Sequence, residues 1–184
     1  NFTWKDYQDR NNNELLAIFG NFVNRTLVLT HKYFEGKVPA MVNLNEKDNA
    51  AIEEMNQYPD KIAHLLDTYK FREALSELMN LARLGNRYLT ENEPWKQFKT
   101  DPERVKTVLA VSLQIVAKLA ILSEPFLPFS AKKLQAMIGL EVSGWNQAKE
   151  TVLLNEESQI GEVELLFTKV EDETVAAQIK KLED

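Results

Sequence analysis

The stretch VKTVLAVSLQIVAKLAIL, from Val105 to Leu122, decides the fold of this chain. Its apolar residues surround the helix nearly completely, and a helix that is hydrophobic all round must be buried among other elements. Asp101 can cap the start of this helix, and Pro102 suits its first turn. We therefore predict an all-α bundle built round one central helix.

Further helices are expected on both sides of this segment. The first is predicted to follow a capping box at Asn11-x-x-Glu14 and to run through Phe34, before Gly36 and Pro39 stop it. The others are expected at about Glu46–Asp67, with a break or kink at Pro59, at about Phe71–Leu89, at Ala131–Ile138, capped by Ser130, and at Glu173–Leu182.

The chain changes character near residue 140. From Glu141 to Asp184 there are eleven acidic and four basic residues, a net charge of −7, whereas the preceding 17 acids and 18 bases sum to +1. Val163, Leu165 and Phe167 alternate like a short strand or an extended arm. We predict a bundle of about five helices over residues 1–140, and an acidic arm over 141–184 that packs on the bundle or on a neighbouring domain. Any RNA surface should lie in the first part, because an acidic segment binds phosphate poorly.

Composition excludes several kinds of site. The chain has no cysteine, so disulfides, thiolate zinc sites and thiol nucleophiles are absent, and a cytoplasmic location fits this composition. No apolar run approaches the roughly 20 residues of a membrane span, so we expect no membrane contact. His31 and His64 have no plausible metal set nearby, and no Gly-rich phosphate loop is present. We expect no metal site and no catalytic residue.

The first predicted helix contains a row of small polar residues. On a wheel of about 100° per residue, this row lies opposite the apolar face and consists of Asn13, Ala17, Asn21, Asn24 and His31. Asparagine is a poor helix former, and Gly20 costs about 1 kcal/mol relative to alanine. A solvated face usually contains Glu, Lys, Gln and Arg instead. We interpret Asn13 and Asn21 as functional, whereas Asn24 and Arg25 could equally tie this helix to its neighbours.

A second unusual stretch, NRYLTENEPW, ends a helix with a rigid proline and then a tryptophan, Pro94 and Trp95. Tryptophan is usually a core residue, but the residues before it are polar, which favours an indole at the surface. An exposed indole can stack on a nucleobase for about 1–3 kcal/mol. Carboxamides beside an aromatic plate are what recognition of an unstacked base requires. Arg83 and Arg87 could bind phosphates or pair with carboxylates.

Four segments resemble the C-terminal anticodon-binding domain of methionyl-tRNA synthetases. They are NNNELLAIFGNFVNRTL (Asn11–Leu27), GNRYLTENEPWK (Gly85–Lys96), EPFLPFSAKKL (Glu124–Leu134) and LFTKVEDE (Leu166–Glu173). They follow the family order and span nearly the whole chain. The resemblance implies an all-α anticodon-binding domain of a class I synthetase without its catalytic part.

This resemblance also implies a function. The domain would recognise the CAU anticodon, so that the catalytic domain of the same polypeptide charges the tRNA with methionine using ATP and Mg. By position, the recognising residues would be Asn13, Ala17, Asn21 and Trp95 beside Pro94, although some family members have Asn, Asn and Arg at the first three positions. Alone, the chain is expected to be non-catalytic and to bind no cofactor.

Two other functions stay open. The chain could be a helical protein-interaction module with Trp95 as an anchor. It could also be the anticodon domain of a related class I synthetase for another amino acid. Preferred binding of a stem-loop with the CAU anticodon would separate the three.

Overall fold

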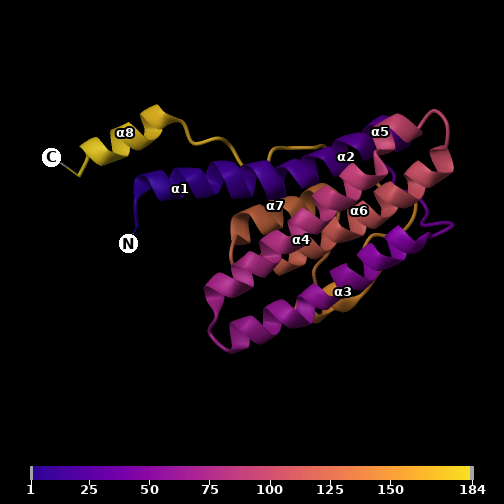
Figure 1. The fold of residues 1–184 in the computed structure, drawn as a ribbon, viewed down its shortest axis with the longest axis horizontal. Helices are drawn as coiled ribbons and strands as arrows, with labels where there is room; N and C mark the ends of the chain where they lie inside the picture. Colours follow the sequence, from indigo (N-terminus) through magenta and orange to yellow (C-terminus); the bar gives the residue numbers. More distant parts are fainter. Residues whose placement is uncertain (1, 183–184) are drawn as a thin grey trace.

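The computed structural model describes residues 2–182, which fold into a helical bundle with a projecting end (Figure 1). Its elements are α1 (Trp4–Arg10), the π-helical η1 (Asn11–Gly20), α2 (Asn21–Phe34), α3 (Glu46–Asp67), α4 (Phe71–Asn92), α5 (Pro94–Gln97), α6 (Pro102–Leu122), α7 (Pro128–Ile138), the 3₁₀-helical η2 (Trp145–Lys149) and α8 (Asp172–Lys180).

α1, η1 and α2 form one continuous helix along the bundle (Figure 1). It begins at Trp4, where the hydroxyl of Thr3 accepts a hydrogen bond from the backbone nitrogen of Asp6 at 3.0 Å. The predicted start at Asn11 is therefore wrong by about two turns. The helix ends as expected before Gly36, which has φ +76°.

α6 lies in the middle of the bundle, as its sequence predicts (Figure 1). Asp101 caps it by accepting from the backbone nitrogen of Arg104 at 3.0 Å, and residues 107–122 are all buried. By length and a mean hydropathy of 1.9 this helix could cross a membrane, which the sequence expectation denied. However, 94% of its most apolar window is buried inside the fold. The hydropathy of α6 is thus accounted for by its place in the core.

The helices round α6 follow the predicted pattern with local differences. α3 has the predicted bounds but is continuous through Pro59, so no break occurs there. α4 extends one turn beyond the predicted end at Leu89. α7 starts at Pro128 rather than after Ser130, because the proline itself fits the first helical position.

Glycine allows α2 and α4 to approach closely. A Cβ atom on Gly85 of α4 would lie 2.3 Å from the ring of Phe22 on α2. Phe22 is fully buried, so its ring has no free space to move into. Gly85 therefore sets the distance between the two helices that border the candidate site described below.

The chain after residue 140 returns over the bundle as an arm without a regular strand in the described residues. The side-chain amide of Gln114 on α6 accepts from the backbone nitrogens of Leu153 and Leu154, at 2.7 and 3.0 Å, and donates to the Leu154 oxygen at 2.8 Å. The predicted alternation fails because Leu165 is exposed while Phe167 is buried. The segment is an extended arm, and α8 follows it alongside α1 (Figure 1).

Asn11, the predicted helix cap, and its neighbour Asn12 hold this arm instead. Asn12 donates through Nδ2 to the Val170 oxygen and accepts from the Val170 nitrogen, both at 2.9 Å. Asn11 donates to the Thr168 oxygen at 2.9 Å. A Cβ on Gly20 would lie 3.2 Å from the ring of Phe167, so the absence of a side chain at Gly20 allows the arm to pack closely on this helix.

Candidate nucleic-acid interface

Arg25 and Trp95 meet at the end of the bundle where α2 lies beside α5. The guanidinium carbon of Arg25 lies 5.0 Å from the centroid of the Trp95 ring, within the range of a cation–π contact. The indole is 38% exposed, and Arg25 is half-buried. Trp95 is therefore a surface residue, with the guanidinium over one face of its ring.

A sharp corner between α4 and α5 places this indole. Glu93 ends α4 in a left-handed conformation with φ 39° and ψ 55°, and the buried Pro94 starts α5. A non-glycine residue in this conformation costs on the order of 1–3 kcal/mol and persists only where the surroundings fix it. On the far side of the corner, Phe98 stacks on Tyr33 of α2 with ring centroids 4.1 Å apart.

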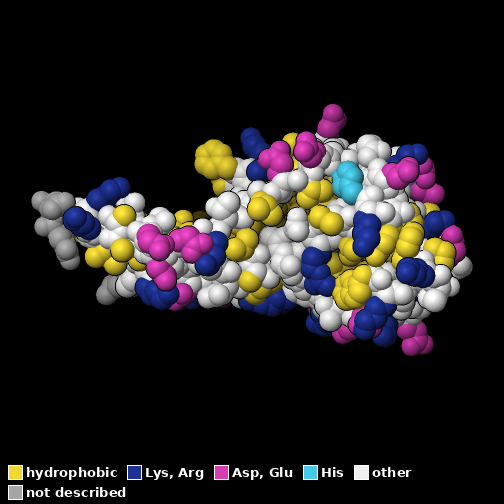
Figure 2. Space-filling model, turned by 90° about the horizontal axis from the view of Figure 1, so that it is seen from above, with side chains coloured by type: hydrophobic (Ala, Val, Ile, Leu, Met, Phe, Trp, Pro, Cys, Tyr) yellow, Lys and Arg dark blue, Asp and Glu magenta, His cyan; other side chains and the backbone are white. Residues whose placement is uncertain are grey.

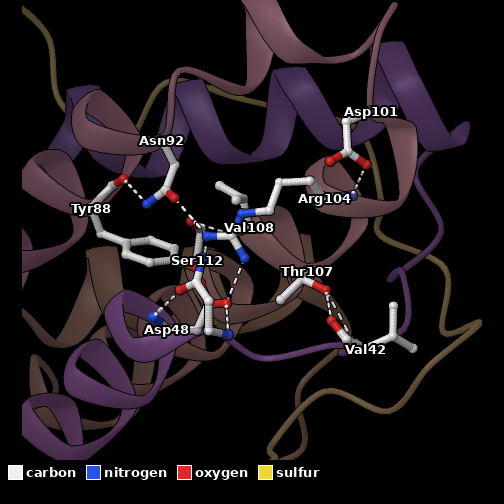
Figure 3. A network of polar contacts seen from close by, with 10 residues as sticks. Val42, Asp48, Tyr88, Asn92, Asp101, Arg104, Thr107, Val108 and Ser112 are labelled. Carbon is white, nitrogen blue, oxygen red and sulfur yellow. Dashed lines mark hydrogen bonds and ion pairs between the residues drawn. The ribbon is translucent and has the colours of Figure 1, made fainter.

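The near side of the corner is fixed by a buried polar cluster, the Asp48 network, which consists of Asp48, Tyr88, Asn92 and Arg104 (Figure 3). Arg104 donates to both carboxylate oxygens of Asp48, at 2.5 and 2.7 Å, and the Tyr88 hydroxyl donates to the same group at 2.5 Å. Arg104 also donates to Asn92 Oδ1 at 2.6 Å. Asn92 Nδ2 in turn donates to the backbone carbonyl oxygen of Tyr88 at 2.8 Å. Because Asn92 is the last residue of α4, the network holds the exit of that helix.

Asp48 is fully buried and accepts two hydrogen bonds from the Arg104 guanidinium. Burial raises the pKa of its carboxyl, but hydrogen bonds from Arg104, Tyr88 and the Asn45 backbone outweigh burial and hold the pKa below its ordinary value. Burial, together with the hydrogen bond to Asp48, raises the pKa of the Tyr88 hydroxyl. This network was not predicted from the sequence, although the Asn45-x-x-Asp48 spacing before a helix is a signal of a capping box.

Asn21 lies one turn before Arg25 on the same helix, and its side chain is exposed. Its Nδ2 donates to Oδ1 of Asn86 on α4 at 3.3 Å, and Asn86 Nδ2 donates to the Ile18 oxygen at 2.9 Å. The two amides therefore link the first helix to α4 beside the cation–π pair. Asn21 was predicted as a site residue, whereas Asn86 was not.

The structure separates Asn13 from this cluster. Asn13 and Ala17 are exposed, but with a rise of 1.5 Å per residue Asn13 is up to about 18 Å from Arg25 along the helix. In the π-helical stretch the backbone nitrogen of Asn21 donates to the Leu16 oxygen, five residues earlier. Because a π-turn holds more residues than an α-turn, Asn13, Ala17 and Asn21 lie closer to one line than the wheel predicts.

Of the six predicted site residues, Arg25 and Trp95 meet, Pro94 directly precedes Trp95, and Asn21 lies one turn before Arg25 on α2. Asn24 is half-buried and precedes Arg25 in the chain. Arg83 and Arg87 of α4 contact neighbouring side chains. Arg87 pairs with Glu54 at 2.6 Å, and Arg83 donates to Asn80 at 3.0 Å.

Charge is distributed unevenly over the face that contains α2 and the arm. In Figure 2, Lys and Arg side chains surround hydrophobic atoms on the right of the view, where Figure 1 places α2 and α5. Exposed cations of this region are Lys32, Lys96 and Lys99. On the projecting part, where α8 lies, acidic and basic side chains are mixed. Because residues 141–184 carry a net charge of −7, phosphate is favoured on the bundle rather than on this segment. Within residues 2–182, no group of three or more His, Asp and Glu side chains could hold a metal ion.

Comparison with known proteins agrees with the earlier resemblance. The family model described as the anticodon binding domain of methionyl tRNA ligase matches residues 38–183. Proteins named methionine–tRNA ligase from Cytophaga hutchinsonii and Phocaeicola vulgatus are each 55% identical, over 100% and 98% of this chain. These matches cover the first helix, which precedes the family-model match. The chain spans 27% of the length of both relatives.

Solved structures share the fold. The free-state methionyl-tRNA synthetase of Mycobacterium tuberculosis superposes with a TM-score of 0.83 at 22% identity, covering 92% of this chain and 35% of that one. The same enzyme in complex with methionyl-adenylate gives a TM-score of 0.80 at 24% identity, covering 86% and 32%. The chain belongs to the family of anticodon-binding domains of methionyl-tRNA ligases.

Proposed function

We propose that this chain binds the CAU anticodon of a methionine tRNA. The observation that supports this most directly is the placement of Trp95, Arg25 and Asn21 together on the surface. An indole, a guanidinium and a carboxamide supply stacking, charge and base-edge hydrogen bonding within one small area. Membership of the methionyl family favours this triplet over those of other synthetases.

Each group has a distinct task in this proposal. A base taken out of the anticodon stack lies on the Trp95 indole. Arg25, released from the ring that it covers, donates to a phosphate or to a base edge through its planar set of N–H groups. Pro94 fixes the backbone before the indole. Asn24 borders Arg25, and Asn13 would meet only a nucleotide further along the helix.

In the whole protein, we infer, the catalytic domain of the same polypeptide charges this tRNA with methionine, using ATP and Mg in the cytoplasm. The names of the relatives and the adenylate bound to the M. tuberculosis enzyme support this inference. Anticodon binding contributes by positioning, because binding energy gained far from the reacting end of the tRNA helps to orient it. The present chain alone should neither bind a cofactor nor aminoacylate.

A titration tests the proposal. The chain should bind a stem-loop with the CAU anticodon more tightly than the same stem-loop with a scrambled triplet. Trp95→Ala should weaken binding by about tenfold or more, as loss of one base stack predicts, with unchanged helix content in circular dichroism. Trp145→Phe is the matched control, because Trp145 lies on η2, where its indole donates to the Pro59 oxygen. Equal binding of both stem-loops would refute the proposal and favour the protein-interaction module.

A further inference from the structure

The side-chain amide of Asn86 has one defined orientation. Its Nδ2 donates to the backbone oxygens of Ile18, at 2.9 Å, and of Ala82, at 3.4 Å. Backbone carbonyl oxygens only accept hydrogen bonds, so the Asn86 atom that faces them must be its nitrogen. Its oxygen therefore faces the other way, and an amide oxygen is only an acceptor.

This orientation is passed on to Asn21. Nδ2 of Asn21 donates to Oδ1 of Asn86 at 3.3 Å, so the nitrogen of Asn21 is turned toward α4. The polar atom of Asn21 that is turned away from α4 is its oxygen. A freely rotating surface asparagine presents either a donor or an acceptor, whereas this one presents an acceptor on the exposed side of the helix.

We propose that Asn86 is a specificity-determining residue, which holds Asn21 so that it accepts a hydrogen bond from the exocyclic amino group of a base. This inference rests on the proposed function. Cytosine and adenine have such an amino group, where uracil and guanine have a carbonyl oxygen. An oxygen of Asn21 facing that carbonyl leaves two acceptors opposed and unpaired, which costs affinity. Asn86 contacts no base itself and acts as a positioning residue through Asn21.

The CAU triplet contains both kinds of amino-bearing base, so two exchanges test the inference. Stem-loops with UAU and CGU replace cytosine by uracil and adenine by guanine without changing ring size. For the unmodified chain, one of these exchanges should weaken binding by about tenfold, as expected for a lost hydrogen bond and an unpaired acceptor. The ratio between the affinities for the original and the exchanged stem-loop should fall to within about threefold in Asn86→Ala. Binding of the exchanged stem-loop should improve, because the Asn21 amide can then rotate and donate a hydrogen bond. A gain in affinity for the wrong base is not produced by a loss of structure.

A double variant tests the route through Asn21 by the ratio between the affinities for the original and exchanged stem-loops. In an Asn21→Ala background, Asn86→Ala should leave that ratio unchanged. If circular dichroism shows that Asn86→Ala does not fold, Asn86→Leu, which also lacks an acceptor, replaces it.

The outcomes separate the inference from the proposed function. If the unmodified chain does not prefer CAU to a scrambled triplet, the proposed function fails. If it prefers CAU but tolerates both exchanges, or if Asn86→Ala or Asn86→Leu leaves the ratio intact, only the inference fails. An equal effect of Asn86→Ala on this ratio with and without Asn21 would overturn it too.

Discussion

Asp48 is a charged residue without solvent contact, and its partners determine what its loss would cost. Asp48→Ala leaves Arg104 and the Tyr88 hydroxyl without their acceptor in the interior. We expect it to lower the free energy of unfolding by about 3–5 kcal/mol, the usual cost of removing one partner of a buried pair. Urea denaturation at neutral pH measures this. Asp60→Ala is the control, since Asp60 is 72% exposed in its ion pair with Lys149, and its removal should cost no more than about 1 kcal/mol.

Lys118 is buried in α6 and donates to the backbone oxygens of Ala148 and Glu150, at 2.6 and 2.7 Å. Burial lowers the pKa of its amine to about 8, partly opposed by Glu150. The unfolded chain then holds this proton more tightly than the folded one, so the stabilisation is present above the ordinary pKa of 10.5 and is lost as pH falls through about 8.

The predicted result is a change in the pH dependence of stability. Unfolding free energies measured between pH 8 and 10 should rise with pH more steeply in the unmodified chain than in Lys118→Met, because only the former carries this proton linkage. Lys132→Met, at an exposed position of α7, should retain the slope of the unmodified chain. Parallel curves for Lys118→Met and the unmodified chain would show that Lys118 keeps its ordinary pKa in the fold.

At the level of elements, consecutive asparagines of one helix have different structural roles. Asn12 exchanges two hydrogen bonds with Val170 of the arm, whereas Asn13 is exposed. Asn12→Ala should therefore accelerate amide hydrogen exchange in the arm and in α8, by removing about 1 kcal/mol for each lost bond. Asn13→Ala should not. Unchanged exchange in Asn12→Ala would mean that other contacts suffice to hold the arm.

The elements whose bounds were predicted correctly have strong local signals. α6 starts after Asp101, whose side chain accepts from the backbone nitrogen of Arg104. α3 starts after Asn45, which forms a capping box with Asp48. The start of the first helix was mispredicted because Asn11-x-x-Glu14 has the spacing of a capping box. In the structure Asn11 instead bonds a segment more than 150 residues away, and no local pattern contains that information.

The candidate site was predicted in its parts but not in its arrangement. The polar row and the Pro94–Trp95 pair are visible in the sequence, because both depart from ordinary helix composition. Their meeting depends on the corner at Glu93 and on a network drawn from three helices, which residue patterns do not reveal. Asn86 was missed for the same reason, since its role comes from its distance to Ile18 and Asn21.

For the whole molecule, charge separation limits how RNA can bind. Residues 141–184 carry a net charge of −7, whereas residues 1–140 sum to +1, and Lys and Arg side chains surround hydrophobic atoms at the end where α2 and α5 lie (Figure 2). With about two or three phosphates engaged, the logarithm of the affinity for a CAU stem-loop should fall with the logarithm of salt concentration with a slope near −2. Titrations at several salt concentrations measure it. Lys99→Gln should make the slope shallower by about 0.7, and Lys132→Gln should not alter it. A slope of about −5 or steeper would require a much larger phosphate contact than this surface offers.

The π-helical stretch gives the long first helix a rotational phase that an α-helix of equal length would not have. An α-helix advances about 100° per residue, and η1 advances less at each of its ten positions. Asn11, Asn12 and Gln8, whose Nε2 donates to the Val170 backbone oxygen at 3.0 Å, therefore face the arm, while Arg25 faces the indole. Removing a single residue at an exposed position such as Ala17 would convert the π-helical stretch toward α-helical geometry. The residues that contact the arm and the residue that contacts Trp95 would then no longer face their partners at the same time. The length of this segment is consequently as constrained as its composition.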